Sequence, residues 1–242
     1  MIIDPLKQFA IREIFRLNLF GLDLIFTNSS LAMLFSVSAL LLMFIPVFIT
    51  SNSLGNSKLY ALIEIVYDMI NQMVESAAGD KNRKFAPLIF SIFLFILSCN
   101  LLGMLPWSFT ATSHIAVTFA IAICIFIFVT LLGFFKHGAN YLSLFLPKGV
   151  PIYIAPLLVV IEFFAYIARP ISLSIRLAAN MIAGHIVLKV LAAFTVMAGI
   201  LGAFPFMLLT ILTGFEIFVS VLQAYIFAIL TCVYLNDALN LH

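Results

Sequence analysis

One apolar stretch, residues 151–197, is too long to cross a membrane once along a straight perpendicular path. At 1.5 Å per residue an unbroken helix of this length would measure roughly 70 Å, whereas the hydrocarbon core of a bilayer is about 30 Å thick. Either Pro170 divides the stretch into two spans, or one long helix lies strongly inclined. A second over-long stretch, 206–235, follows a turn at 198–205 that contains glycine and proline. The two stretches together predict a long helical hairpin.

Composition places the whole chain in the membrane. Of its 242 residues 64% are hydrophobic and only 9% are charged, against about a quarter charged in soluble domains. A net charge of +2 is too small to indicate a nucleic-acid partner. The three cysteines lie in apolar runs, which argues against a disulfide framework and against a metal site. We therefore expect an all-α polytopic membrane protein with no metal and no cofactor.

The remaining segments complete a single membrane domain, 1–242. Alternating charged and apolar residues near the N-terminus predict a short amphipathic helix at the membrane interface. In residues 58–78, acidic and amide side chains recur at spacings of three and four. We expect this segment to be a helix that lies on a surface and does not cross the bilayer. The predicted parts are an interfacial segment 1–30, a first span 31–49, the amphipathic surface helix 58–78, a two-span hairpin 85–135 and the long hairpin 151–237. This gives about five membrane passages.

Loop charges predict the orientation. The segments 50–86 and 136–150 contain six lysine or arginine residues, while the loops 106–113 and 198–205 contain none. Because basic loops are retained on the cytoplasmic side, we expect the first two segments to be cytoplasmic. Five passages then place the N-terminus outside and the C-terminus inside.

Polar side chains accumulate at bilayer depth in the long hairpin. An arginine cannot be deprotonated in practice, and burying one in the membrane costs from about 2.5 to well over 10 kcal/mol. Such residues mark functional sites more often than packing contacts when they gather in one element. The set is Glu162, Arg169, Arg176, Asn180, His185, Lys189, Glu216 and Gln223.

Helical spacing sorts these residues. Glu162, Arg169 and Arg176 are seven apart and share one face, with Asn180 four residues further on. His185 is about half a turn away and is expected to face Glu216 within the hairpin. Histidine and glutamate can take up and release protons, whereas an arginine holds a carboxylate ionised and repels passing cations. No carboxylate in the chain pairs obviously with Arg176, so its partner is expected on another molecule.

The motifs that carry these residues resemble one known family. The run from Ser172 to His185, Ser-Leu-Ser-Ile-Arg-Leu-Ala-Ala-Asn-Met-Ile-Ala-Gly-His, is similar to the arginine-bearing signature of subunit a of F-type ATP synthases. The resemblance extends to Asn-Leu-Leu-Gly-Met-Leu-Pro at 100–106 and to Glu216 with the run 222–234. It covers most of the chain from the first span onward.

The resemblance implies a stator subunit that works against a ring of c subunits, each with one membrane carboxylate. Arg176 matches the arginine that separates two aqueous half-channels, and Asn180 and Gln223 match polar residues near the ring. His185 and Glu216 match the acid–base pair of the outer half-channel, with the two residue types exchanged relative to many bacterial members.

The remaining matches are weaker. Glu162 matches a carboxylate on the cytoplasmic exit side, Arg169 a basic position one heptad before the arginine, and Lys189 no functional position. The implied partners are the c-ring, the peripheral-stalk b subunits, the lipid bilayer and protons. Because no Walker-type glycine loop occurs, the chain is expected to be no enzyme by itself. A bacterial inner membrane is the expected location, with the mitochondrial inner membrane as the alternative.

Two other functions remain open from the residues. A self-contained secondary transporter would use Arg176 to bind an anionic substrate, and it would need discontinuous helices that end near the membrane midplane. A structural scaffold would use the polar residues only as contacts between helices and would tolerate their replacement.

Overall fold

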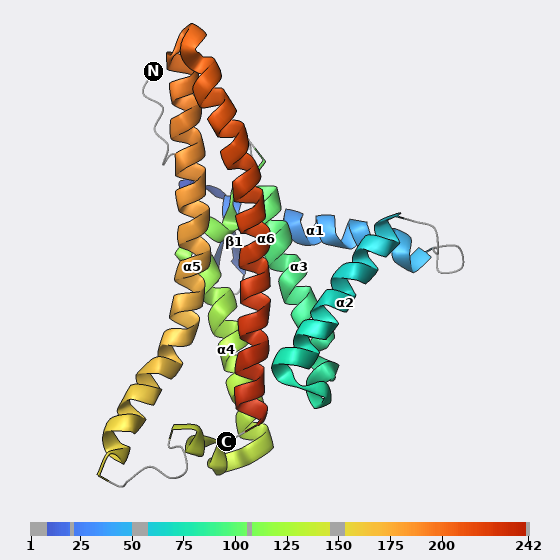
Figure 1. Ribbon diagram of the computed structural model, residues 1–242, viewed down its shortest axis with the longest axis vertical. Helices are drawn as coiled ribbons and strands as arrows, with labels where there is room; N and C mark the ends of the chain where they lie inside the picture. The colour runs from blue at the N-terminus through green and yellow to red at the C-terminus, as the bar shows by residue number, and fades with distance from the viewer. Residues whose placement is uncertain (1–8, 20–21, 50–57, 106–107, 146–152, 241–242) are drawn as a thin grey trace.

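The computed structural model describes residues 9–19, 22–49, 58–105, 108–145 and 153–240, which fold into helices apart from one β-hairpin (Figure 1). The helices are α1 (Asn28–Ile49), α2 (Lys58–Ala78), α3 (Ala86–Gly103), α4 (Ile115–His137), α5 (Ala155–Met197) and α6 (Ala203–Leu239). Short 3-10 helices lie between them: η3 (Asp80–Phe85), η4 (Ala111–Ser113), η5 (Gly138–Phe145) and η6 (Gly199–Gly202). Within the described residues, α1, α3, α4, α5 and α6 are long and apolar enough to cross a membrane. The predicted all-α polytopic fold is confirmed.

The long hairpin consists of two continuous helices. Pro170 lies inside α5 and does not end it, so α5 runs through 43 residues, or roughly 65 Å. A proline inside a helix removes one backbone hydrogen bond and bends the axis, and Figure 1 shows α5 changing direction in its lower part. The alternative of one long helix is therefore the one that the chain adopts.

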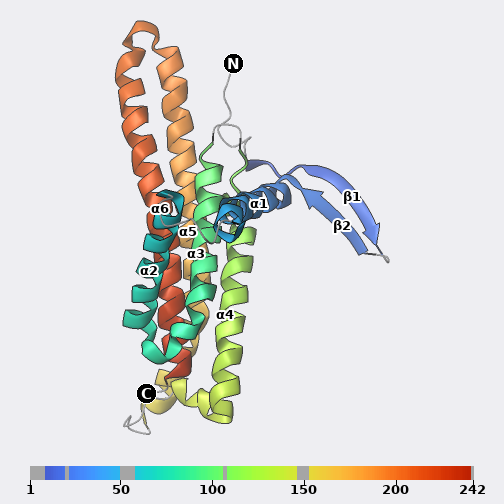
Figure 2. The same cartoon turned by 90° about the vertical axis from the view of Figure 1, so that its right-hand side faces the viewer.

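Helix α1 lies across the direction of the hairpin. It has 22 residues, or roughly 33 Å, which matches the thickness of a bilayer core. Figure 1 shows α1 running across the direction of α5 and α6, and Figure 2 views α1 nearly end-on while the hairpin stands upright. If α1 follows the membrane normal, the hairpin lies far from the normal, as its excess length requires.

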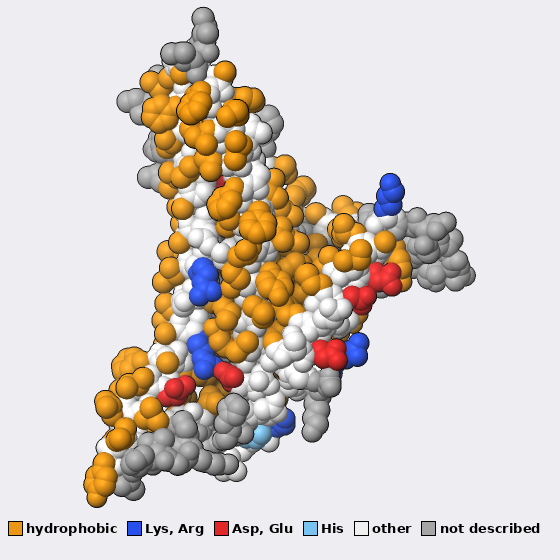
Figure 3. Space-filling view, viewed as in Figure 1, with side chains coloured by type: hydrophobic (Ala, Val, Ile, Leu, Met, Phe, Trp, Pro, Cys, Tyr) orange, Lys and Arg blue, Asp and Glu red, His pale blue; other side chains and the backbone are white. Residues whose placement is uncertain are grey.

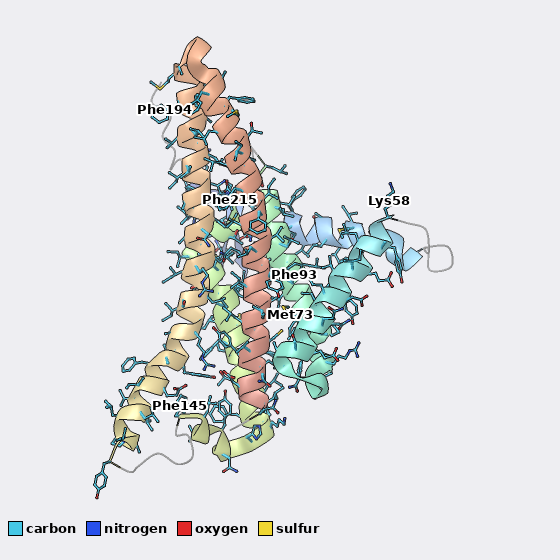
Figure 4. The ribbon with its side chains drawn as sticks, in the orientation of Figure 1. Lys58, Met73, Phe93, Phe145, Phe194 and Phe215 are labelled. Carbon is cyan, nitrogen blue, oxygen red and sulfur yellow. The ribbon has the colours of Figure 1, made fainter. Side chains whose placement is uncertain are left out.

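The core is built around the C-terminal half of α6, which packs against α2, α3, α4 and α5. Ile89, Ile96 and Phe227 are at most 1% exposed. Figure 4 labels Met73 of α2 and Phe93 of α3, two buried members of this core, where their helices approach α6. By contrast, the upper part of the hairpin projects beyond the other helices (Figure 2) and exposes apolar side chains to its surroundings.

The predicted N-terminal amphipathic helix is wrong over Glu13–Leu19, which form a β-strand. Strands β1 (Glu13–Leu19) and β2 (Leu22–Thr27) form an antiparallel hairpin instead, while residues 1–8 lie outside the described part of the chain. The sequence alternates with a period of two, and the register pairs Phe15 with Phe26 and Leu17 with Leu24. Cross-strand aromatic pairs stabilise a hairpin, and the rings of Phe15 and Phe26 stack with their centroids 4.8 Å apart.

Helix α2 has the bounds that the sequence predicted. Its apolar face packs on α3 and α6, with Ile70 and Val74 fully buried, and its acidic residues Glu64, Asp68 and Glu75 are exposed. Figure 3 shows acidic side chains along this outer side of α2. The amphipathic pattern therefore determines which face of α2 packs against α3 and α6.

Two basic residues tie the end of α4 to the end of α6. Lys136 Nζ donates to the carbonyl of Leu239 at 2.8 Å, and His137 Nε2 lies 3.0 Å from the same oxygen. Cations at a helix C-terminus stabilise its unpaired carbonyl groups. The segment that begins at Lys136 and the C-terminal end of α6 therefore lie side by side at one end of the molecule (Figure 1).

We predict that Ile70→Ala lowers the free energy of unfolding by about 2–5 kcal/mol, since it opens a cavity where α2 meets the core. Ile65→Ala on the same helix is the matched control, because Ile65 is 69% exposed whereas Ile70 is 0% exposed. Thermal unfolding of the purified protein gives the comparison. Equal melting temperatures for the two variants would contradict the packing of α2 described above.

Candidate functional site

His185 of α5 and Glu216 of α6 face each other inside the hairpin, as the sequence predicted. His185 Nδ1 lies 3.8 Å from Glu216 Oε1, and the two residues are 9% and 6% exposed. The separation is longer than a hydrogen bond, so one water molecule or a small side-chain movement would connect them. This juxtaposition of two titratable groups can pass a proton from one helix to the other.

Gly184 permits the close approach of Glu216. A Cβ atom added at Gly184 would lie 2.7 Å from Glu216 Cδ and 3.1 Å from Glu216 Cγ. Small residues allow helices to approach closely in membrane proteins. The glycine before the histidine therefore determines where the carboxyl group of the opposite helix can lie.

The other side of the His185 ring contacts Thr110, a residue that the sequence analysis did not identify. Thr110 Oγ1 lies 3.0 Å from His185 Nε2 and donates to the carbonyl of Gly103, also at 3.0 Å. Thr110 comes just before η4, which packs against both α3 and α5. No periodic pattern surrounds a residue in a linker, so nothing in the sequence marked it.

Buried polar atoms without hydrogen-bond partners gather on the elements around this pair. Among the described residues they are Asn100 Oδ1, Thr112 Oγ1, His114 Nε2 and both carboxyl oxygens of Glu216. Asn100 also links α3 to α6, because its Nδ2 donates to the carbonyl of Ser220 at 3.2 Å. Buried polar groups normally have partners, so these atoms are suited to bind water or carry a proton.

Burial disfavours the charged form of His114, at the start of α4. Burial lowers the pKa of His114 below its usual value, and its ring stacks on Phe109 with centroids 5.1 Å apart. A neutral imidazole can accept a hydrogen bond at one nitrogen and donate one at the other. His114 therefore adds a polar group to this buried region, where its neutral form is favoured.

Asn180, Glu216 and Gln223 line one open cavity between α5 and α6. Its volume is about 510 Å³, and Ala183, Gly184 and Leu222 are among the other lining residues. Gln223 is 7% exposed, seven residues after Glu216 on the same face of α6. The structure therefore brings together three of the predicted site residues, with His185 directly behind Glu216.

Arg176 is exposed on the outside of the hairpin. Within the described part of the chain its guanidinium has no hydrogen bond and no ion pair. Its neighbours Ile175 and Ala179 are exposed as well, and Ala183 continues the face of small residues. Figure 3 shows basic side chains along α5, with hydrophobic side chains on the α6 side and, at the lower end, acidic side chains beside them. The expectation that Arg176 lacks an internal carboxylate partner is confirmed for the described residues.

Arg169 has a partner that the sequence analysis missed. Its Nη1 lies 2.9 Å from Asp237 Oδ2 at the C-terminal end of α6, and both side chains are about three-quarters buried. The guanidinium also lies over the rings of Tyr166 and Tyr234, at 5.4 and 5.1 Å from their centroids. These contacts join α5 to α6 at the opposite end of the hairpin from η6.

A hydroxyl network extends this contact. Tyr166 bonds to Thr130 of α4 at 2.6 Å and to Tyr141 of η5 at 3.0 Å. Burial and the contact with Tyr166 raise the pKa of Tyr141 well above its usual range, so its phenol is neutral. The network connects three elements around Arg169.

The two remaining predicted residues are less constrained. Glu162 is half-buried on α5 and has no hydrogen bond or ion pair within the described ranges. Lys189 is half-buried one turn after His185 and likewise makes no ion pair there. The structure does not bring either residue into the cavity lined by Asn180 and Gln223.

A protein-family model matches most of the chain. The model of the ATP synthase A chain family matches residues 31–236 and thus includes every predicted site residue. The chain belongs to the ATP synthase A chain family. It is an a subunit of the membrane sector of an ATP synthase and an integral membrane protein.

Family membership also bears on the alternatives. A secondary transporter would need discontinuous helices at mid-membrane, but α5 and α6 of this a subunit are continuous over 43 and 37 residues. The matched family transports protons as part of a complex. No feature of the site therefore favours the self-contained transporter.

We predict that Gly184→Ala reduces ATP-driven proton pumping by about tenfold, because the added methyl group displaces the Glu216 carboxyl. Gly214→Ala on α6 is the control, since a Cβ atom there meets nothing within 4 Å. Acidification of inverted membrane vesicles measures both. Normal pumping by Gly184→Ala would show that the position of the Glu216 carboxyl is unimportant.

Proposed function

We propose that this a subunit is the stator of a proton-translocating F-type ATP synthase and couples proton flow to rotation of a c-ring. The observation that carries the proposal is the exposed Arg176, which has no hydrogen bond or ion pair within the described residues. An unpaired guanidinium facing lipid costs at least about 2.5 kcal/mol. A carboxylate on a neighbouring subunit would remove this cost. The resemblance of the motif to the family signature implies that this partner is the membrane carboxylate of a c subunit.

The small residues beside Arg176 support a moving partner. Ala179 and Ala183 follow it on the same side of α5 and are exposed. Small side chains allow a second helix to approach and to slide past without interlocking. The face of α5 that carries Arg176 is therefore suited to the surface of a rotating ring.

The outer half-channel is proposed to pass His185 and Glu216 and to reach the ring through the cavity lined by Asn180 and Gln223. The 3.8 Å separation of the pair and the unpaired oxygens of Glu216 support a route that contains water. Histidine in the path favours protons over sodium, because sodium requires several oxygen ligands.

The inner half-channel is proposed to lie toward Glu162, beyond Arg176 on the same helix. Arg169, held by Asp237, would supply a fixed charge beside it. Arg176 stands between the two routes along α5, and its charge repels a proton that would pass directly. A proton-motive force of 200 mV provides roughly 4.6 kcal/mol per proton, and this barrier directs that energy through the ring.

The assembly and location follow from the same proposal. We infer contacts with the peripheral-stalk b subunits and with lipid along the exposed apolar helices. The chain is proposed to be no enzyme by itself, because ATP hydrolysis belongs to other subunits. Its N-terminal residues 1–9 resemble the bacterial branch, so we propose the bacterial inner membrane, with the N-terminus outside.

We predict that Arg176→Ala abolishes coupled proton transport while the chain still inserts into the membrane, because the barrier and the partner charge are lost. Ile175→Ala is the matched control, since its side chain is also exposed at the same depth. ATP-driven acidification of inverted vesicles measures the difference. Normal acidification with Arg176→Ala would refute the proposed role.

We also predict that His185→Ala and Glu216→Ala each slow proton transport by roughly tenfold to a hundredfold, as expected for loss of an acid–base group. Exchanging the residues, with His185→Glu and Glu216→His in one chain, should restore part of the rate, because the two groups face each other across 3.8 Å. The same vesicle assay applies. An exchanged variant as slow as the single variants would contradict a direct partnership.

A further inference from the structure

We propose that Thr110 is a positioning residue that holds neutral His185 in the tautomer with its proton on Nε2, so that Nδ1 faces Glu216 with a free lone pair. This inference rests on the proposed function of His185 and Glu216 in proton transfer. It assigns to one ring nitrogen the exchange of protons with Glu216.

The direction of one hydrogen bond carries the assignment. A threonine hydroxyl has a single proton, and Thr110 Oγ1 donates it to the carbonyl of Gly103 at 3.0 Å. A carbonyl can only accept. The contact of 3.0 Å between Thr110 Oγ1 and His185 Nε2 must then use a proton on the imidazole nitrogen.

The hydrogen bond from Thr110 to the carbonyl of Gly103 is energetically favoured. Gly103 is the last residue of α3, and the final carbonyl groups of a helix lack partners within the helix. The hydroxyl of Thr110 satisfies one of them inside a buried region, since Thr110 is only 6% exposed. Turning the hydroxyl toward His185 would leave that carbonyl unpaired, at the free-energy cost of a lost buried hydrogen bond.

Thr110 itself is held rigidly. Its carbonyl accepts hydrogen bonds from the Ser113 backbone at 3.2 Å and from Ser113 Oγ at 2.7 Å. A Cβ atom at Gly103 would lie 2.6 Å from Thr110 Cγ2 and 2.9 Å from its Oγ1, so only glycine leaves room for it. The loop before α4 and the end of α3 together fix the hydroxyl in front of His185.

The consequence concerns the proton path. A proton leaves a carboxyl oxygen of Glu216 and binds to Nδ1, which gives a carboxylate and an imidazolium; the reverse step returns it. Nε2 keeps its proton throughout, since it stays bonded to Thr110, so every proton that His185 takes up or gives up, to Glu216 or to water in the route, passes through Nδ1. Two other residues lie near the ring: Lys189, one turn away on α5, and Phe9, whose ring centroid is 6.4 Å from that of His185. Neither has a carboxylate that could take the place of Glu216 at Nδ1.

The test is nitrogen NMR of the purified ATP synthase labelled with ¹⁵N-histidine, with the His185 signals assigned by their absence in His185→Gln. We expect unprotonated Nδ1 and protonated Nε2 for neutral His185 in the wild type and in Thr110→Ser, which keeps the hydroxyl. Thr110→Val should lose this preference and pump protons about tenfold more slowly, whereas Thr110→Ser should stay within about twofold.

Two further variants make the result specific. Thr118→Val is the control, because Thr118 is fully buried but its hydroxyl donates only to carbonyl groups of the preceding turn. Gly103→Ala should reproduce the loss of the tautomer with the hydroxyl of Thr110 intact, which keeps the test available if Thr110→Val fails to assemble.

A wild-type His185 protonated on Nδ1, or an unchanged tautomer in both Thr110→Val and Gly103→Ala, would overturn the inference. The test of Thr110 and the test of the proposed function of His185 can fail independently. If His185→Gln pumps at the wild-type rate, the role of His185 in transport fails, while the NMR comparison still decides what Thr110 does.

Discussion

The close packing of α5 against α6 at Gly184 is the constraint on which the rest of the site depends. It brings the carboxyl of Glu216 beside the ring of His185 and leaves both carboxyl oxygens buried without hydrogen bonds. It also sets the rotation of α5 about its axis. Because Arg176 is nine residues before His185, the same rotation that buries the histidine turns the arginine outward.

The two arginines of α5 show how context separates chemically identical groups. Arg169 has a carboxylate, two aromatic rings and a hydroxyl network within reach, so its charge is satisfied inside the subunit. Among the described residues Arg176 has no hydrogen bond, ion pair or cation–π contact, and only the Tyr234 phenol is close enough to interact with its charge. One heptad along a helix thus separates an arginine that holds the subunit together from one whose charge is available to another molecule.

Much of this arrangement could be predicted from sequence because helices obey a simple periodicity. The phase of Arg176 relative to His185 follows from their spacing along α5, and α2 begins and ends where its pattern predicted. Apolar length likewise identified the five helices that could cross a membrane. Whether Pro170 divides α5 could not be decided, because a proline can either end a helix or bend it.

The residues that were missed depend on contacts between distant segments. Thr110 meets His185 across 75 positions and Asp237 meets Arg169 across 68, and no local pattern records such distances. The N-terminal hairpin was missed for another reason. Its alternation with a period of two was present in the sequence, but charged residues among apolar ones were interpreted with the helical period.

Because the long hairpin lies across α1, a position along α5 describes more than depth in the membrane. In a helix parallel to the membrane normal, residue number measures depth. In a helix that is strongly inclined, it measures sideways displacement as well. Glu162 and His185 are 23 residues apart, or roughly 35 Å along the axis, so an inclined α5 separates them sideways as well as in depth. In the function proposed above, a proton that enters beside one and leaves beside the other is therefore carried sideways by the ring, and this sideways separation along one helix gives the rotation its direction.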